Sequence, residues 1–278
     1  MRGLSPLPRG LIETSNICAK NCLYCGIRRG NSALARYRMS ESEVLACVAE
    51  AERRGYPAVA LQAGELESEE NTAYYERILL ALANPKLEVT LSLGEQTEAV
   101  YRRWKAAAGD RVLRYLLRIE TSNRELYAKL HPADHSFDRR VECVRTLKRL
   151  GYVTGSGVMI GLPGQTMDDL RRDLDWFEAM RLDMVGMGPY VEEPSSPLAG
   201  RGDVWPEAKR LETALWMIGE VRRRMPHVNI VAATALEALD PDGRELGLAA
   251  GANVIMPDLT PENYKRAYDL YPGKAAVR

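Results

Sequence analysis

The sequence has no excess of either charge, and its hydrophobic runs are short. It contains 38 lysines and arginines and 38 aspartates and glutamates among 278 residues. A chain with zero net charge has no overall attraction to nucleic acid or to an anionic membrane, so we expect neither as a partner. No apolar run approaches the roughly 18 residues that a transmembrane helix needs. The first ten residues, MRGLSPLPRG, lack the apolar centre of a signal peptide.

Cysteine is also scarce. Five cysteines are a low and odd number, which does not fit a disulfide framework and favours the reducing cytoplasm. Three of them, Cys18, Cys22 and Cys25, lie within eight positions. Cys47 and Cys143 lie in helical patterns, where we expect small buried side chains. A tight group of thiols in a reducing compartment predicts metal binding or catalysis.

The number of ligands decides which metal these thiols could hold. A structural zinc site takes four ligands, and the remaining cysteines are far away in the sequence. We expect His131, His135 and His227 to be surface or capping residues in loops. Three thiolates with one vacancy fit a 4Fe-4S cluster whose fourth iron is open to a cofactor. Zinc binding or chance spacing is the alternative.

Strand and helix patterns alternate along the whole chain. The predicted strands cover residues 11–15, 58–62, 87–93, 112–120, 152–160, 183–188, 229–235 and 253–257. Eight strand–helix pairs in strict alternation predict an α/β fold, a parallel sheet closed into a (β/α)8 TIM barrel. An open doubly wound sheet is the alternative. We see no linker, so we predict one domain over residues 1–278.

The helical patterns are amphipathic and carry start and stop signals. The first begins with Ser40 as N-cap and Glu43 in the capping-box position, and it stops at Gly55. The others cover residues 70–84, 97–109, 138–151, 166–181, 206–224, 242–251 and 261–271. The helical segments have ordinary amphipathic sequences, whereas most of the unusual polar, glycine and cysteine residues follow the strands. The active site of a barrel lies at the C-terminal strand ends, so this partition predicts an enzyme.

Residue parity on the fourth strand predicts charged side chains inside the barrel. Residues 114, 116, 118 and 120 share one face, because side chains alternate along a strand. Arg118 and Glu120 need partners there, which a charged ligand or an ion pair between the two residues would supply. Arg114 lies deeper, where we expect a structural ion pair with Glu13.

The cysteine spacing resembles the signature of radical S-adenosylmethionine (SAM) enzymes. The motif CxxxCxxC has an aromatic residue, Tyr24, before its last cysteine, and it follows the first predicted strand. The segments NCLYCGIRRGN, LLRIETSN, GLPGQT, GANVIMPDLTP and YPGK resemble in particular the HydE-type maturases of iron-only hydrogenases. Methylornithine synthase and biotin synthase are related to that type.

The resemblance implies a radical SAM-type TIM barrel and a specific chemistry. In this family, a 4Fe-4S cluster on Cys18, Cys22 and Cys25 reductively cleaves SAM to methionine and a 5′-deoxyadenosyl radical. It also implies a small-molecule substrate, an electron donor such as ferredoxin or flavodoxin, and other hydrogenase maturases as partners.

The resemblance further implies roles for individual residues. Those matching SAM-binding positions are Tyr24, Gln62, Glu65, Thr90, Ser92, Glu120, Arg140, Met184 and Tyr268. Those matching substrate positions are Arg118, Thr234, Met256 and Tyr271. For Arg140 a solvated position on its helix is the alternative, and for the methionines a place in the core.

Several positions depart from the family pattern. The chain begins almost at its first strand, and it carries no cysteine trio after YPGK. Glu192 and Glu193 replace a histidine after the sixth strand, Ala233 replaces a threonine, and Ile119 stands where some members have histidine. We expect two carboxylates at the pocket edge to discourage an anionic substrate. The alternatives are therefore the same chemistry on an amino-acid-like substrate, or a non-catalytic iron–sulfur or zinc protein.

Overall fold

The computed structural model describes residues 6–268 and 270–274. The ends of the predicted domain, and residue 269 of the last predicted helix, lie outside the described residues. Eight parallel strands form one sheet in the order β10-β1-β2-β3-β4-β5-β7-β9. The strands are β1 (Leu7–Ser15), β2 (Ala58–Ala63), β3 (Glu88–Ser92), β4 (Leu113–Leu116), β5 (Val153–Ser156), β7 (Met184–Val185), β9 (Asn229–Ile230) and β10 (Val254–Ile255).

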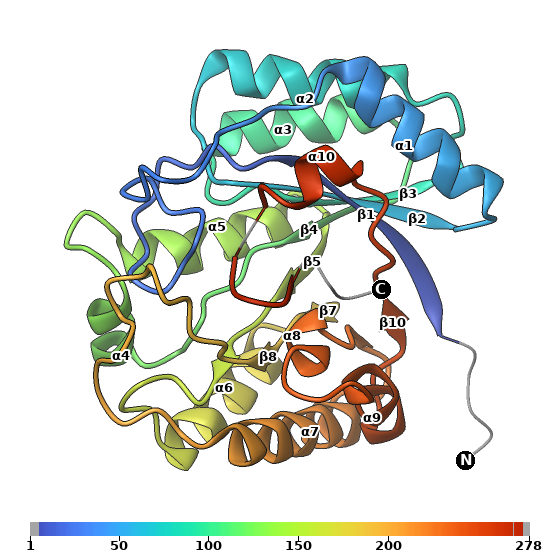
Figure 1. Ribbon diagram of the computed structural model, residues 1–278. Helices are drawn as coiled ribbons and strands as arrows, with labels where there is room; N and C mark the ends of the chain where they lie inside the picture. Colours follow the sequence, from blue (N-terminus) through green and yellow to red (C-terminus); the bar gives the residue numbers. More distant parts are fainter. Residues whose placement is uncertain (1–5, 269, 275–278) are drawn as a thin grey trace.

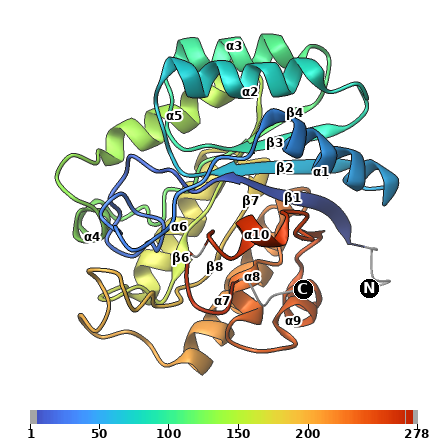
Figure 2. The same ribbon diagram turned by 45° about the horizontal axis from the view of Figure 1, so that its top comes forward.

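The two edges of this sheet meet, so the sheet is a nearly closed barrel. Val231 forms a parallel bridge with Val254, and the Ala232 amide donates to the Val254 carbonyl over 2.9 Å. Figures 1 and 2 show helices around the strands, with α1, α2 and α3 on one side and α7 and α9 on the other. The predicted (β/α)8 barrel is confirmed, and the open doubly wound sheet is excluded.

Two predicted strands are interrupted. Residues 152–160 divide into β5 and β6 (Met159–Ile160), and residues 183–188 divide into β7 and β8 (Gly188–Pro189). Gly157 lies at the first interruption, where a Cβ atom would stand 1.8 Å from the Gly186 carbonyl oxygen. The segments around Gly157 and Gly186 therefore approach too closely for a side chain at position 157. Beyond this point β6 and β8 pair as a separate short sheet.

The helices follow their sequence signals. They are α1 (Glu41–Arg53), α2 (Glu69–Ala81), α3 (Glu98–Ala108), α4 (Arg124–Leu130), α5 (Phe137–Arg149), α6 (Met167–Ala179), α7 (Glu207–Arg224), α8 (Thr234–Glu237), α9 (Gly243–Ala250) and α10 (Glu262–Lys265). Ser40 and Glu43 form the predicted capping box of α1. No helix in the described part of the chain is both long and apolar enough to cross a membrane.

Several elements differ from the prediction. The strand expected over residues 229–235 ends at Ile230, and Thr234 begins α8. The helix expected over 261–271 has only the four residues of α10, and α4 was not predicted. The four-residue helices α8 and α10 lack the apolar period that longer helices show, because one turn has room for only one or two buried side chains.

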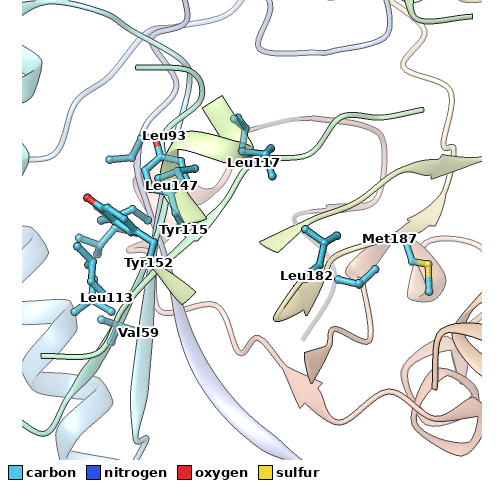
Figure 3. Packing of buried hydrophobic residues seen from close by; sticks show 14 of the residues in the cluster. Val59, Leu93, Leu113, Tyr115, Leu117, Leu147, Tyr152, Leu182 and Met187 are labelled. Carbon is cyan, nitrogen blue, oxygen red and sulfur yellow. The ribbon is translucent and has the colours of Figure 1, made fainter. Parts of the chain in front are cut away.

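Side-chain parity on β4 separates the barrel interior from the outer core. Leu113, Tyr115 and Leu117 are buried in the outer core. Figure 3 shows Tyr115 close to Leu147 of α5 and to Tyr152, the residue before β5. The Tyr115 and Tyr152 rings meet edge to face with centroids 5.9 Å apart. The even-numbered residues of the same stretch consequently point into the barrel.

Candidate active site

A cavity of about 330 Å³ opens at the C-terminal ends of the strands, where the strand-end pattern predicted the site. Of the sixteen residues implied by the resemblance, all but two line it. The lining residues are Cys18, Cys22, Tyr24, Cys25, Gln62, Glu65, Ser92, Arg118, Glu120, Arg140, Thr234, Met256, Tyr268 and Tyr271. One cavity thus collects side chains from positions 18 to 271 of the sequence.

Thr90 and Met184 are not among the residues that line the cavity, and the SAM contacts implied for them stay predictions. Thr90 is two residues before Ser92 on β3 and is buried one layer deeper in the barrel. Met184 is buried too, and its sulfur accepts a hydrogen bond from Arg9 over 3.2 Å. The structure gives Met184 the core position that was the alternative for the methionines.

The cysteines sit on the loop between β1 and α1, which has no regular helix or strand over residues 16–31. The Arg36 side chain stabilises this loop through hydrogen bonds to its main chain. Its guanidinium donates to the carbonyl oxygens of Asn16 at 2.7 Å, Ile27 at 2.8 Å and Arg28 at 2.6 Å. A guanidinium offers five donors in a rigid plane, so one side chain can fix several carbonyl groups of a loop.

The three loop thiols fit an iron–sulfur cluster. Cys18, Cys22 and Cys25 are partly exposed and face one cavity, whereas Cys47 and Cys143 are buried in α1 and α5, as predicted. Within residues 6–268 and 270–274, no three His, Cys, Asp or Glu side chains are grouped so as to hold a single metal ion. Zinc draws its ligands to about 2.3 Å, whereas a cluster spreads three thiolates over three irons. The donor set therefore suits the cluster better than zinc.

Burial favours the protonated form of the three loop thiols. It raises the pKa of Cys22 to about 12, and Arg140 opposes this shift through its positive charge. Burial also raises the pKa values of Cys18 and Cys25. A bound cation or cluster reverses this preference, because the thiolate is the form that ligates metal.

Arg140 belongs to a buried network of charges beside the cysteine loop. Its Nε atom lies 2.9 Å from Glu95 Oε1, and its Nη1 atom lies 3.3 Å from Glu65 Oε2. Lys20, which lies between the first two cysteines, places its ammonium 3.2 Å from both carboxylates. Arg140 is buried and lines the cavity, so the solvated alternative does not hold.

Arg118 and Glu120 form an ion pair with each other on the cavity wall. Arg118 Nη2 lies 3.0 Å from Glu120 Oε2 and also donates to the Val158 carbonyl over 2.8 Å. Burial raises the pKa of Glu120. Its φ angle is 64°, in the left-handed region that a side chain with a Cβ atom disfavours. Strained residues of this kind gather at functional sites.

The last part of the described chain closes one side of the cavity. Gln62 donates to the Tyr268 hydroxyl over 3.3 Å, and the Tyr271 hydroxyl lies 2.7 Å from Thr234 Oγ1. Lys274 forms a buried ion pair with Glu13 of β1.

The predicted pair between Glu13 and Arg114 is wrong. Arg114 binds Glu88 over 2.7 Å, and the partner of Glu13 comes from the other end of the chain.

The two rim glutamates do not enter the cavity. Glu192 accepts a hydrogen bond from the Gly200 amide over 3.1 Å, and Glu193 accepts one from the Ser195 amide over 3.0 Å. Neither lines the cavity, so the expected repulsion of an anionic substrate is not supported. Ile119 points away from the cavity into the core.

Four further residues, one in the cavity wall and three beside it, were missed. Glu95 and Lys274 lie in segments that the sequence had marked, SLGE after the third strand and YPGK, but no role was assigned to either. His131 and His135 were predicted to be surface or capping residues. His131 is the C-cap of α4, in agreement with the capping alternative, but neither side chain lies on the surface. His131 is 4% exposed, and the His135 side chain is 2% exposed. Of the three histidines, only His227 is exposed, as predicted.

Comparison with known proteins identifies the family. The model of the radical SAM superfamily matches residues 12–177. The chain is 45% identical over 276 residues to the [FeFe] hydrogenase maturase subunit HydE of Thermotoga maritima, covering 97% of this chain and 74% of that protein. It is 27% identical over 254 residues to the 3-methylornithine synthase of Methanosarcina barkeri, covering 91% of this chain and 69% of that protein.

Solved structures support the same fold. The crystal structure of methylornithine synthase superimposes with a TM-score of 0.77 at 25% identity, covering 91% of this chain and 72% of that one. The maturase HydG from Carboxydothermus hydrogenoformans gives 0.76 at 21% identity, covering 93% of this chain and 60% of that one, and shows the fold alone. With three cysteines at the mouth of the barrel and close to half of its sequence shared with a HydE subunit, the chain belongs to the radical SAM superfamily and is a homologue of HydE.

Proposed function

We propose that this radical SAM enzyme acts in the maturation of the [FeFe] hydrogenase active-site cluster, on a small-molecule substrate. The observation that carries the proposal is the shared cavity: three thiols, a buried guanidinium and a pair of tyrosine hydroxyls face the same space. The 45% identity to a HydE subunit over 97% of the chain supports the choice of pathway. We place the enzyme in the cytoplasm, where thiols stay reduced, with ferredoxin or flavodoxin as electron donor and the other maturases as partners.

In this proposal Cys18, Cys22 and Cys25 hold a 4Fe-4S cluster. When bound, the cluster supplies the electron that cleaves SAM to methionine and a 5′-deoxyadenosyl radical. Arg140 binds the carboxylate of SAM, because its guanidinium is buried, charged and aimed into the cavity. Glu65 receives the ammonium group on the oxygens that Lys20 and Arg140 contact.

Glu120 and Tyr268 complete the SAM side of the cavity. The substrate side consists of Arg118, Thr234, Met256 and Tyr271. The Tyr271 hydroxyl is already paired with Thr234, so the phenol is held in place before a ligand arrives. The cavity wall is mainly apolar, and it keeps water from a radical formed in the cavity.

Anaerobic reconstitution tests the cluster. We expect about four irons per chain, an EPR signal on reduction that changes when SAM is added, and 5′-deoxyadenosine as a product. Cys22→Ala removes one ligand from the rim without touching the core, so the variant keeps its fold and loses all three signals. Cys47→Ala is the matched control, because Cys47 is buried in α1 away from the cavity. Zinc in place of iron, or 5′-deoxyadenosine from Cys22→Ala, would refute the assignment.

A second experiment tests the pathway. We expect the chain to restore hydrogenase activity in a host that lacks only its HydE subunit, and the Cys22→Ala variant to fail. The similarity to 3-methylornithine synthase makes an amino-acid mutase the second candidate. Incubation with SAM, dithionite and either thiol-containing or amino-acid substrates, followed by mass spectrometry, separates the two functions by their products.

A further inference from the structure

Residues 130–135, which include the last residue of α4 and most of its connection to α5, form three hydrogen bonds with the cysteine loop. The Leu23 amide donates to the Leu130 carbonyl over 2.9 Å. The Tyr24 hydroxyl lies 3.3 Å from His131 Nε2, and the Asn21 amide donates to His135 Nε2 over 3.2 Å. Figures 1 and 2 both show the loop after β1 beside α4.

The hydrogen bonds of His131 fix the position of its proton. Its Nδ1 atom lies 2.8 Å from the Tyr127 carbonyl oxygen, which can only accept, so Nδ1 carries the hydrogen. Nε2 is then the acceptor, and the Tyr24 hydroxyl donates to it. The imidazole also stacks on the Tyr127 ring with centroids 3.9 Å apart. Burial lowers the pKa of His131 to about 3, which keeps the ring neutral.

His135 repeats the arrangement. Its Nδ1 atom lies 2.8 Å from the Asp134 carboxylate, again a pure acceptor, so its Nε2 atom accepts the hydrogen bond from the Asn21 amide. Its side chain is almost fully buried, while Asp134 is exposed. Two histidines on one short segment thus hold their protons on Nδ1 and offer Nε2 to the cysteine loop.

We propose that His131 and His135 are positioning residues for the cysteine loop. They fix the main chain at Asn21 and the phenol of Tyr24, the residues on either side of the Cys22–Leu23 pair. The position of Cys22 relative to the other thiols therefore depends on two imidazoles that belong to another element. Since both Nε2 lone pairs are engaged by the loop, neither histidine is free to become a fourth ligand. The fourth iron of a cluster bound there would stay open to a cofactor.

The proposal rests on the function assigned above only in naming what the loop binds, and its first test needs no cluster. Asparagine in place of histidine keeps a polar group at the δ position and removes the ε acceptor, whereas glutamine offers an acceptor near the ε position. In the apo protein we expect His135→Asn to speed hydrogen exchange at the Asn21 amide by about tenfold or more, because that amide loses its partner. His135→Gln should retain most of the protection.

The Leu61 amide of the core and the exposed His227→Asn variant serve as controls for the fold. If the Asn21 amide exchanges equally fast in wild type and in His135→Asn, or if glutamine protects no better than asparagine, the proposed role is wrong. Loss of protection at Leu61 in the asparagine variant alone would likewise count against it, because that result indicates a general structural role.

The second test uses reconstituted protein. We expect His131→Asn and Tyr24→Phe each to speed iron loss to a chelator severalfold and to alter the SAM-induced EPR change. Tyr24→Phe also removes a side-chain hydrogen bond to Cys22. The double variant should therefore be no worse than Tyr24→Phe alone, since that change already breaks the hydrogen bond to His131. His131→Gln should resemble wild type. Additive effects, or equal damage from glutamine and asparagine, would overturn the role of His131. If wild type itself takes up no iron while the exchange results hold, the proposed function fails and the positioning role stands.

Discussion

Lys274 forms an ion pair with Glu13 inside the barrel, although the two residues are 261 positions apart in the chain. Glu13 is fully buried on β1, and the ammonium of Lys274 lies 5.1 Å from the centre of the Tyr268 ring. The pair therefore ties the segment that carries Tyr268 and Tyr271 to the first strand. It is a structural tie that also shapes the cavity wall.

Removing one partner of this pair should destabilise the protein strongly. We expect Lys274→Met to lower the free energy of unfolding by about 3 kcal/mol, because it leaves Glu13 buried without its cation. The double variant with Glu13→Gln should recover much of that loss. Urea unfolding measures both. Arg266→Met is the control, because the Arg266–Glu262 pair is exposed and should contribute about 0–1 kcal/mol. A loss of the same size in the double variant would contradict the expectation.

Gly64 is expected to tolerate no side chain. A Cβ atom there would lie 2.3 Å from the Ile17 carbonyl oxygen and 2.8 Å from Cys18 Cβ, so Gly64→Ala must push the cysteine loop away from β2. We expect the variant to fold but to bind substantially less iron on reconstitution. Gly219→Ala is the matched control, since its Cβ would meet only the Ala250 carbonyl at 3.7 Å. Full iron content in Gly64→Ala would show that the loop adapts.

Glu95 acts on the cavity through Arg140. It is 1% exposed and does not line the cavity, yet it lies 2.9 Å from the Arg140 guanidinium. Glu95→Gln weakens the contact that holds the Arg140 guanidinium in position for the SAM carboxylate. We therefore expect SAM to bind about tenfold more weakly, an effect of roughly 1.4 kcal/mol. Turnover at saturating SAM should change little.

Equilibrium dialysis and the dependence of rate on SAM concentration measure the two quantities separately. Glu69→Gln is the control, because Glu69 is exposed and pairs with Arg103, which does not line the cavity. Unchanged SAM affinity in Glu95→Gln would separate Glu95 from the site.

Asp173 should make stability depend on pH. It is fully buried on α6, one oxygen accepts from the Ser122 amide over 2.6 Å, and burial raises its pKa to about 7. A carboxyl whose pKa is higher in the folded than in the unfolded state stabilises the fold at low pH. That contribution is full below its unfolded pKa near 4 and is lost as the pH rises through 7.

The test compares wild type with Asp173→Asn, which keeps the acceptor for Ser122 and cannot ionise. Between pH 5 and pH 8 we expect the free energy of unfolding of wild type to fall by about 1–3 kcal/mol relative to the variant. Parallel pH profiles from urea unfolding would mean that Asp173 does not titrate in this range.

Much of the fold could be predicted because the barrel repeats one unit. Each strand and helix carries its own local signals, such as the capping box at Ser40 and Glu43, and eight units in alternation leave few topologies. The interruption at Gly157 could not be predicted, because it depends on how closely another strand passes. Thr234 was misplaced for a similar reason: a four-residue helix is too short to show a period.

Site residues could be predicted where a motif follows the end of a strand. They could not be predicted where the position of a side chain depends on a partner far away in the sequence. The cysteine motif and the parity of Arg118 and Glu120 place those side chains in the cavity. Which cation faces Glu13, and where Glu192 and Glu193 turn, depend on contacts across the fold. The same holds for His131 and His135, since an isolated histidine in a loop has no pattern that distinguishes a surface residue from a buried acceptor.

The side of the cavity that contains Lys274 is made last during synthesis. Ribosomes add about 5–20 residues per second, so the three thiols leave the exit tunnel tens of seconds before Tyr268, Tyr271 and Lys274 are made. Until then β1 has no β10 beside it, Glu13 lacks its cation, and the cysteine loop lacks the contact between the Gly26 amide and the Leu270 carbonyl. The nascent chain therefore exposes its three loop thiols well before the cavity that they line is complete.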